Sequence, residues 1–177
     1  MKLNLGCGND IRKGWINLDI QEREGVDIIH DLNKLPLHFE DEIFDVVLCK
    51  DIFEHVKYFA LISEIYRILK KGGILIIKVP HFTSKSNYLD PTHINTFSSR
   101  TFYYFVDDDE FAYNRDAKQF SKIKTRIRFE GFDILIFRII NKFLENWVNK
   151  SVRRQRFYER SFLRIFPAFS LEVILKK

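Results

Sequence analysis

Apolar residues fall in short runs over the first half of the chain, and this pattern predicts strands. Between the last two runs, apolar positions recur every three or four residues over 57–70, which predicts an amphipathic helix. Lys70 and Lys71, followed by Gly72 and Gly73, predict the end of that helix, because cations and a left-handed glycine favour a helix C-terminus. The predicted strands are 2–6, 15–20, 26–30, 44–49 and 74–79.

The pattern changes after residue 80. Residues 80–96 are polar and predict a loop, and residues 99–106 predict a short helix. Charged and apolar residues alternate over 122–129, which is typical of a half-exposed strand at an antiparallel sheet edge. Further helices are predicted at 133–148 and 151–165, and a final strand at 169–175.

This order of elements predicts an α/β fold, and a length of 177 residues suits a single domain over 1–177. The expected architecture is a Rossmann-like three-layer sandwich around a mostly parallel seven-stranded sheet. The last two strands predict an antiparallel C-terminal hairpin at one edge. Residues 131–166 are predicted to form a helical insert before the last strand.

The composition, 46% hydrophobic and 30% charged, is that of an ordinary soluble globular protein. No uninterrupted apolar run reaches about 18 residues, so we expect no transmembrane helix. Met1 and Lys2 lead directly into a strand, so we expect no signal peptide. Two cysteines, Cys7 and Cys49, argue against a disulfide framework and are expected to be reduced thiols in a cytoplasmic protein.

The charge is distributed unevenly. Residues 1–110 hold 13 Lys and Arg against 18 Asp and Glu, whereas residues 111–177 hold 16 against 6. Such a basic segment suggests an anionic partner, or it can be a solvated face that binds nothing.

The first predicted strand ends in the turn Gly6-Cys7-Gly8. Glycine permits a tight turn and lets backbone N–H groups approach a ligand closely. Asp19 ends the second predicted strand and Asp31 follows the third, so both carboxylates are expected at the same sheet edge, where open α/β sheets bind ligands. Asp19 is suited to accept hydrogen bonds from ribose hydroxyls and Asp31 from an adenine amine. Alternatively, each caps a helix or shapes a turn.

Several motifs together resemble the class I S-adenosylmethionine-dependent methyltransferases, most closely the small type-11-like branch. The resemblance covers about residues 2–80. It implies a Rossmann-like fold, S-adenosylmethionine as the cofactor and methyl transfer as the activity. The motifs are Leu3-Asn4-Leu5-Gly6-Cys7-Gly8, Asn17-Leu18-Asp19, Asp31-Leu32, Phe44-Asp45-Val46-Val47, Phe53-Glu54-His55-Val56 and Leu69-Lys70-Lys71-Gly72-Gly73.

The resemblance also implies positions for the cofactor. Gly6, Cys7 and Gly8 would line its methionine part through backbone atoms, and Cys49 and Lys50 would lie beneath its sulfonium and amino-acid end.

Four further residues would bind the nucleoside. Asp19 would hold the ribose with Ile20 beside the adenine, and Asp31 and Leu32 would contact the adenine.

The chain departs from the family pattern in its first turn, where Asn9 and Asp10 stand in place of a third small residue. A nicotinamide enzyme is disfavoured, because the GxGxxG spacing is incomplete and the acid follows Gly8 by 11 residues instead of about 20.

Candidate catalytic residues lie beyond the fifth predicted strand. Methyl transfer to a hydroxyl is assisted by a base, and His93, His81 and Asp90 are predicted to serve this step, with Asp90 orienting a histidine. Glu54 and His55 form an alternative. A metal held by His81, Asp90 and His93 is conceivable by analogy with metal-dependent O-methyltransferases, but we expect no metal.

The predicted function is therefore methylation, most simply O-methylation, of a small molecule or of a glycan or lipid-linked sugar. An RNA methyltransferase that uses the basic insert and a non-catalytic cofactor-binding scaffold are the alternatives, with nucleic acid the less favoured partner. The segment 133–165 has three interpretations. It packs on the sheet, it forms a homodimer contact or lid, or it lies on an anionic surface as a basic amphipathic helix at the membrane periphery.

Overall fold

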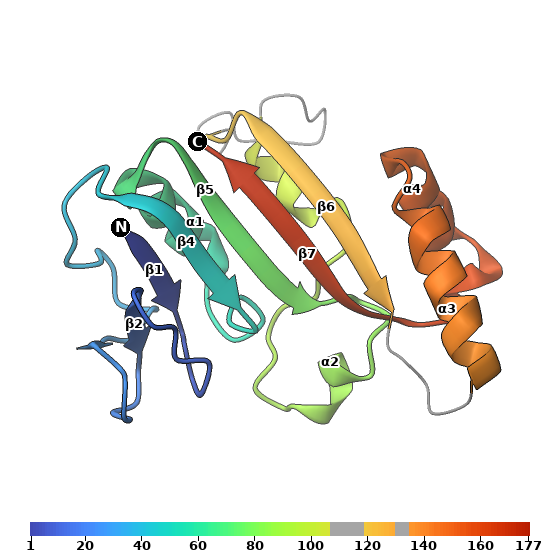
Figure 1. The fold of residues 1–177 in the computed structure, drawn as a ribbon, viewed down its shortest axis with the longest axis horizontal. Helices are drawn as coiled ribbons and strands as arrows, with labels where there is room; N and C mark the ends of the chain where they lie inside the picture. Colours follow the sequence, from blue (N-terminus) through green and yellow to red (C-terminus); the bar gives the residue numbers. More distant parts are fainter. Residues whose placement is uncertain (107–118, 130–134) are drawn as a thin grey trace.

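The computed structural model describes residues 1–106, 119–129 and 135–177. Its sheet has seven strands in the order β3-β2-β1-β4-β5-β7-β6 (Figure 1). The first five strands are parallel where they pair, and β7 runs antiparallel to both of its neighbours, as expected for the C-terminal hairpin. The strands are β1 (Lys2–Leu5), β2 (Ile16–Asp19), β3 (Ile28–Ile29), β4 (Phe44–Lys50), β5 (Leu69–Pro80), β6 (Lys122–Phe129) and β7 (Ala168–Lys176).

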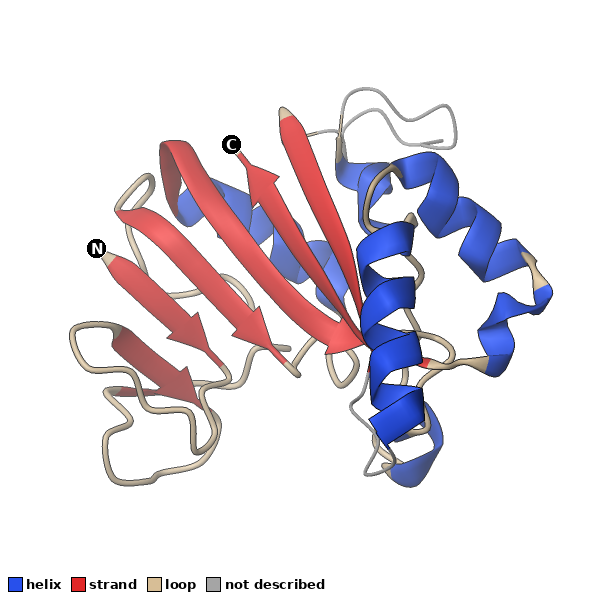
Figure 2. Ribbon diagram, turned by 45° about the vertical axis from the view of Figure 1, so that its right-hand side comes forward, coloured by secondary structure: helices blue, strands red, loops and turns tan. Residues whose placement is uncertain are grey.

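The helices gather around the second half of the sheet (Figure 2). The connections that follow β1, β2 and β3 contain no helix within the described residues and consist of turns, bends and irregular loop. None of the described helices is long and apolar enough to span a bilayer. The helices are α1 (Tyr58–Ile68), α2 (Ser86–Leu89), α3 (Leu135–Val148) and α4 (Val152–Arg160), with 3-10 turns η1 (Thr101–Phe105) and η3 (Phe162–Ile165).

The end of α1 differs from the sequence-based expectation. The predicted glycine cap after Lys70 and Lys71 is wrong, because the helix ends at Ile68 and Leu69 already starts β5 in an extended conformation. Gly72 does adopt a left-handed φ of +76°, but its N–H donates to the carbonyl of Lys177 at 3.1 Å. Its conformation therefore serves the closure of the β5–β7 pair.

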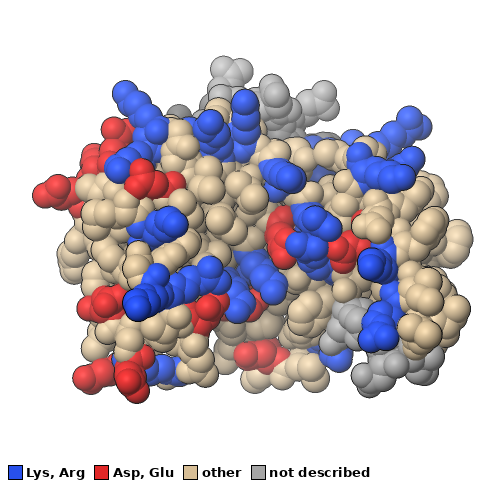
Figure 3. Space-filling model, viewed as in Figure 1, with Lys and Arg blue, Asp and Glu red and all other residues tan. Residues whose placement is uncertain are grey.

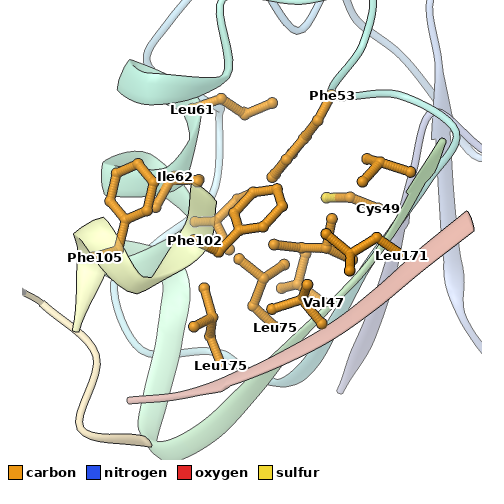
Figure 4. Packing of buried hydrophobic residues seen from close by; sticks show 14 of the residues in the cluster. Val47, Cys49, Phe53, Leu61, Ile62, Leu75, Phe102, Phe105, Leu171 and Leu175 are labelled. Carbon is orange, nitrogen blue, oxygen red and sulfur yellow. The ribbon is translucent and has the colours of Figure 1, made fainter. Parts of the chain in front are cut away.

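The hydrophobic core lies between the sheet and the layer formed by α1 and η1. Successive side chains of a strand point to opposite faces, so alternate positions of β4, β5 and β7 supply this core. Figure 4 shows Phe102 and Phe105 of η1 packed over these strands. Each such large apolar side chain contributes about 1.5–3 kcal/mol on burial. The strand residues that face this layer include Val47, Cys49, Leu75, Leu171 and Leu175.

The opposite face of the sheet carries more polar side chains. Positions that alternate with the core residues include Lys78, Lys124, Arg126 and Lys176. Figure 3, seen from the side opposite α1, shows Lys and Arg spread over this face. The basic character of the second half of the chain is thus partly a property of the sheet.

Helix α3, helix α4 and the turn between them contact the outer edge of β6. The Asn149 side chain in this turn takes the hydrogen bonds that a neighbouring strand would otherwise make. Its Oδ1 accepts from the Ile127 N–H at 2.8 Å, and its Nδ2 donates to the Ile127 carbonyl at 2.7 Å. The Gln155 amide donates to the carbonyl of Thr125 at 2.9 Å. These bonds satisfy backbone groups that an edge strand otherwise leaves open to association.

Replacing Asn149 tests this edge pairing. We expect Asn149→Ala to lower the free energy of unfolding by about 1–3 kcal/mol, because it strips both partners from the Ile127 backbone. Denaturant unfolding measures the change. The matched control is Lys150→Ala, at the neighbouring exposed position, which should unfold like the parent. Equal stability of all three proteins would show that the insert does not support β6.

Candidate active site

The turn after β1 brings backbone N–H groups to the carboxyl edge of the sheet. Gly6 and Gly8 have φ values of +62° and +51°, which side chains rarely adopt. A Cβ on Gly6 would lie 1.9 Å from Cδ1 of Ile52, whereas one on Gly8 would meet nothing within 4 Å. The N–H of Gly8 donates to Oδ2 of Asp19 at 2.8 Å. The turn is therefore tied to the end of β2 and leaves open space over Gly8.

Asp19 lies beside this open space in a cavity of about 580 Å³. The residue is only 8% exposed, and its second oxygen, Oδ1, accepts from the N–H of Gln21 at 3.0 Å. Two backbone bonds fix the carboxylate, and its remaining lone pairs are free to accept hydroxyl hydrogens. The wall of the cavity is formed by Gly6, Gly8, Asp19, Ile20, Gln21, Arg23, His30, Asp31, Leu32, Asn33, Asp51, Ile52, His55, Val56 and Asp90.

Six of the nine predicted cofactor residues line this cavity. Asp31 and Leu32, in the loop that follows β3, form part of the cavity wall. Oδ1 of Asp31 accepts from the Asn33 N–H at 3.0 Å. Together with Asp19 and Ile20, Asp31 and Leu32 surround a space whose donors and acceptors suit a nucleoside.

Cys7 and Lys50 line a smaller adjoining hollow of about 280 Å³. The ammonium of Lys50 lies 3.1 Å from Oδ2 of Asp10, and Arg12 contacts the same oxygen at 3.0 Å. The hydrogen bond from Arg12, with that from Lys50, holds the pKa of Asp10 below its usual value. Asp10 thus stays charged beside the glycine turn, where the family pattern has a small residue.

Cys49 lies in the hydrophobic core instead. Its side chain is fully buried among core residues (Figure 4), and burial raises the pKa of its thiol. Alternation along β4 explains the position, because Cys49 shares the face of Val47 while Lys50 points to the other side. Cys49 thus ends up near the end of β4, as expected, but it lines neither of the hollows that contain the other predicted cofactor residues.

A second cavity, of about 610 Å³, adjoins the first. The two share Asp51, His55 and Asp90 as lining residues. One molecule in each cavity would therefore meet across these three side chains. The other residues that line the second cavity are Glu54, Pro80, Ser86, Leu89, Pro91, His93, Phe169 and Ser170.

His93 and Asp90, two of the predicted catalytic residues, both line this second cavity. Nε2 of His93 lies 3.9 Å from Oδ2 of Asp90, and the histidine side chain is 8% exposed. Its Nδ1 is buried and has no hydrogen-bond partner. One nitrogen of His93 is therefore available to a bound molecule.

His81 has a different environment. The ring is fully buried, with Nδ1 2.8 Å from Oγ1 of Thr83 and Nε2 3.1 Å from Oε1 of Glu159. Oε1 of the same Glu159 also accepts from the N–H of Ser99 at 2.6 Å. Both ring nitrogens are engaged and His81 lines neither cavity, so these contacts give it a structural position between β5 and α4.

Glu54 is a deeply buried acid that lines the second cavity. It is 1% exposed, its Oε2 has no hydrogen-bond partner, and burial raises its pKa to about 7. The sequence suggested Glu54 and His55 only as an alternative pair of bases. Asp51, with a left-handed φ of +54°, was missed, and its position immediately after β4 was the available signal.

Comparison with known proteins shows which families and folds this chain resembles. Residues 4–77 match the sequence model of a family described as a methyltransferase domain. An uncharacterised protein of Methanocaldococcus jannaschii is 51% identical over 47 residues, which are 27% of this chain and 21% of that protein. The chain thus matches only about a fifth of the length of this relative.

Solved structures share the whole fold. A SAM-dependent methyltransferase of Archaeoglobus fulgidus superposes with a TM-score of 0.64 at 20% identity, over 99% of this chain and 85% of the other. Phosphoethanolamine N-methyltransferase 2 of Haemonchus contortus, solved with phosphomonomethylethanolamine and S-adenosylhomocysteine, gives a TM-score of 0.54 at 19% identity, over 99% of this chain and 48% of the other. The family match over residues 4–77 supports the expected resemblance to class I S-adenosylmethionine-dependent methyltransferases, and the shared fold confirms the Rossmann-like architecture predicted from the sequence.

A substitution at Asp19 tests the cofactor site. We expect Asp19→Asn to weaken S-adenosylhomocysteine binding about tenfold or more, because a hydrogen bond to a charged group contributes about 1.5–3 kcal/mol. Calorimetric titration measures the affinity. The control is Glu22→Gln, which removes an exposed acid three residues along, and it should bind like the parent. Unchanged affinity in Asp19→Asn would remove Asp19 from the site.

A matched pair of glycine substitutions separates backbone strain from cavity filling. Gly8→Ala and Gly14→Ala both place a side chain at positive φ with open space around the Cβ, so each should lose about 1–2 kcal/mol of stability. Only Gly8 lines the cavity, so only Gly8→Ala should also weaken S-adenosylhomocysteine binding. Equal affinity of the two variants would show that the cofactor does not approach Gly8.

Proposed function

We propose that the protein transfers the methyl group of S-adenosylmethionine to an oxygen of a small molecule, or of a sugar in a glycan or lipid-linked precursor. The adjoining cavities carry this proposal, because they share Asp51, His55 and Asp90 and so give a donor and an acceptor a common boundary. Their volumes, about 580 and 610 Å³, fall in the range of small-molecule sites.

The residues of the first cavity fit the cofactor. The Asp19 carboxylate would accept the ribose hydroxyls, Asp31 and Leu32 would contact the adenine, and the open space over Gly8 would admit the cofactor against the backbone. When bound, S-adenosylmethionine supplies an electrophilic methyl group on sulfur. The protein then has to hold the acceptor oxygen in line with that methyl, and such positioning can contribute about 7 kcal/mol or more to the barrier reduction.

The second cavity offers groups that can act on an acceptor hydroxyl. His93 and Glu54 each hold a buried polar atom without a hydrogen-bond partner. A hydroxyl entering the cavity would lie beside these two side chains. We therefore place the acceptor oxygen between His93 and the boundary formed by His55 and Asp90.

Methyl transfer from tritiated S-adenosylmethionine to a panel of sugars, phosphosugars and hydroxy acids tests the proposed activity. With an acceptor from that panel, His93→Ala should lower kcat about tenfold to a thousandfold, while S-adenosylhomocysteine affinity stays unchanged. His38→Ala, at an exposed position outside both cavities, is the control. A full-rate His93→Ala protein would remove His93 from the reaction.

The exposed side chains of α4 and η3 suggest that the protein binds an anionic membrane surface, where the acceptor would lie. Phe157, Phe162 and Ile165 are 54%, 77% and 69% exposed. Arg153, Arg156 and Arg160 line a hollow together with Phe157. Exposed aromatic residues with arginines beside them are the composition of an interfacial helix. We propose that this surface docks on anionic lipid, which would bring a lipid-linked sugar to the enzyme.

Vesicle flotation tests this docking. The full chain should float with phosphatidylglycerol vesicles and not with phosphatidylcholine vesicles, and added salt should release it. Changing Arg153, Arg156 and Arg160 together to Gln should abolish flotation, whereas Lys122→Gln and Lys124→Gln on β6 should not. Failure to float, with a concentration-dependent dimer in solution, would favour a homodimer contact.

A further inference from the structure

Three side chains of metal-ligand type converge where the two cavities meet. One ligand atom from each of Glu54, His55 and His93 lies within 4.8 Å of the other two. From these residues we infer that the acceptor cavity holds a divalent transition-metal ion, bound by one carboxylate and two imidazoles. The inference deepens the proposed function, on which it rests for the role of the ion.

Two of these three side chains carry a buried atom without a hydrogen-bond partner. Oε2 of Glu54 and Nδ1 of His93 are buried without a hydrogen bond; Glu54 is 1% exposed and the His93 side chain is 8% exposed. An unsatisfied buried polar group costs about 1–3 kcal/mol, so each such group in a native structure calls for a partner such as an ion or a ligand. A cation between them would satisfy both atoms at once.

Hydrogen bonds to neighbouring residues fix which ring nitrogen of His55 carries the hydrogen, and they leave the other nitrogen able to bind a metal ion. The hydroxyl of Thr92 donates to Oδ1 of Asp90 at 2.6 Å, so its oxygen is left to accept from Nδ1 of His55 at 2.9 Å. The proton of neutral His55 therefore lies on Nδ1, and Nε2 keeps its lone pair. Metal-bound histidines are commonly oriented by such an outer hydrogen bond.

The loops that carry the three residues are fastened to each other. The N–H groups of Ile94 and Asn95 donate to the Glu54 carbonyl at 2.8 and 3.3 Å. The Asn95 side chain donates to the carbonyls of Phe53 and Val56, both at 2.8 Å. The segment that holds His93 is thus fixed against the segment that holds Glu54 and His55, so the cluster is preorganised.

The donor set indicates the kind of ion. Imidazole nitrogen with a carboxylate suits Zn²⁺, Co²⁺, Ni²⁺ or Mn²⁺, whereas Mg²⁺ and Ca²⁺ prefer oxygen ligands throughout. Three protein ligands leave at least one position for another molecule. Since Glu54, His55 and His93 line the acceptor cavity, that position would be open to an acceptor oxygen. An ion at this place lowers the pKa of a bound hydroxyl and fixes its direction.

Cobalt binding by the chelator-treated full chain tests the inference. Titration with CoCl₂ should give visible d–d absorption that saturates at one ion per chain, and ZnCl₂ should displace it while MgCl₂ should not. Glu54→Gln and His93→Ala should each weaken Co²⁺ binding at least tenfold. Glu54→Gln keeps the shape of the side chain, so its fold is expected to survive.

Two controls make the test decisive. His38→Ala removes an exposed histidine whose ring lies 5.3 Å from that of His30, and it should leave Co²⁺ binding unchanged. S-adenosylhomocysteine affinity is measured on the same preparations. Absence of a saturable Co²⁺ spectrum, or equal binding by the parent and Glu54→Gln, would overturn the metal site. Intact S-adenosylhomocysteine binding in that case would leave the proposed methyl transfer standing.

Discussion

The hydrogen bond from the Gly8 N–H to the Asp19 carboxylate is the contact on which the site depends. It forms because β1 and β2 run parallel as neighbours, with Leu5 opposite Leu18, so that both strands end at the same edge. The left-handed glycines then turn the backbone toward the acid. This contact places an open stretch of backbone and a fixed carboxylate on one wall of a cavity. These are the two features that bind the nucleotide and its ribose in Rossmann-type sites.

Most of the strands could be predicted because the pattern that marks a strand is local. Short apolar runs, each followed by glycine or an acid, gave β1, β2 and β4, and the alternation over 122–129 gave β6. The prediction failed where tertiary pairing decides the conformation. The Gly72 region looked like a helix cap, but pairing of Leu69 with Phe44 extends it into β5. The same limit explains why Cys49 was expected at the cofactor and lies in the core.

The acceptor side of the site was harder to anticipate, since its residues come from loops that meet only in the fold. His93 and Asp90 were predicted from their chemistry alone. Their neighbour Glu54 becomes prominent only in the fold, where its side chain is buried and Asn95 fastens the two loops together. His81 belonged to the same polar stretch, yet Glu159 of α4 engages it. Helix α4, which approaches β6 through Gln155, thus decides which histidine faces the cavity.

A crystal structure of the full chain with S-adenosylhomocysteine would test the central claim most directly, which is that the two cavities hold cofactor and acceptor side by side. We expect the ribose within hydrogen-bond distance of Asp19, the adenine beside Leu32, and the sulfur directed toward the boundary at His55 and Asp90. A nucleoside bound elsewhere, or a sulfur directed away from the cavity that contains His93, would contradict the assignment of both cavities.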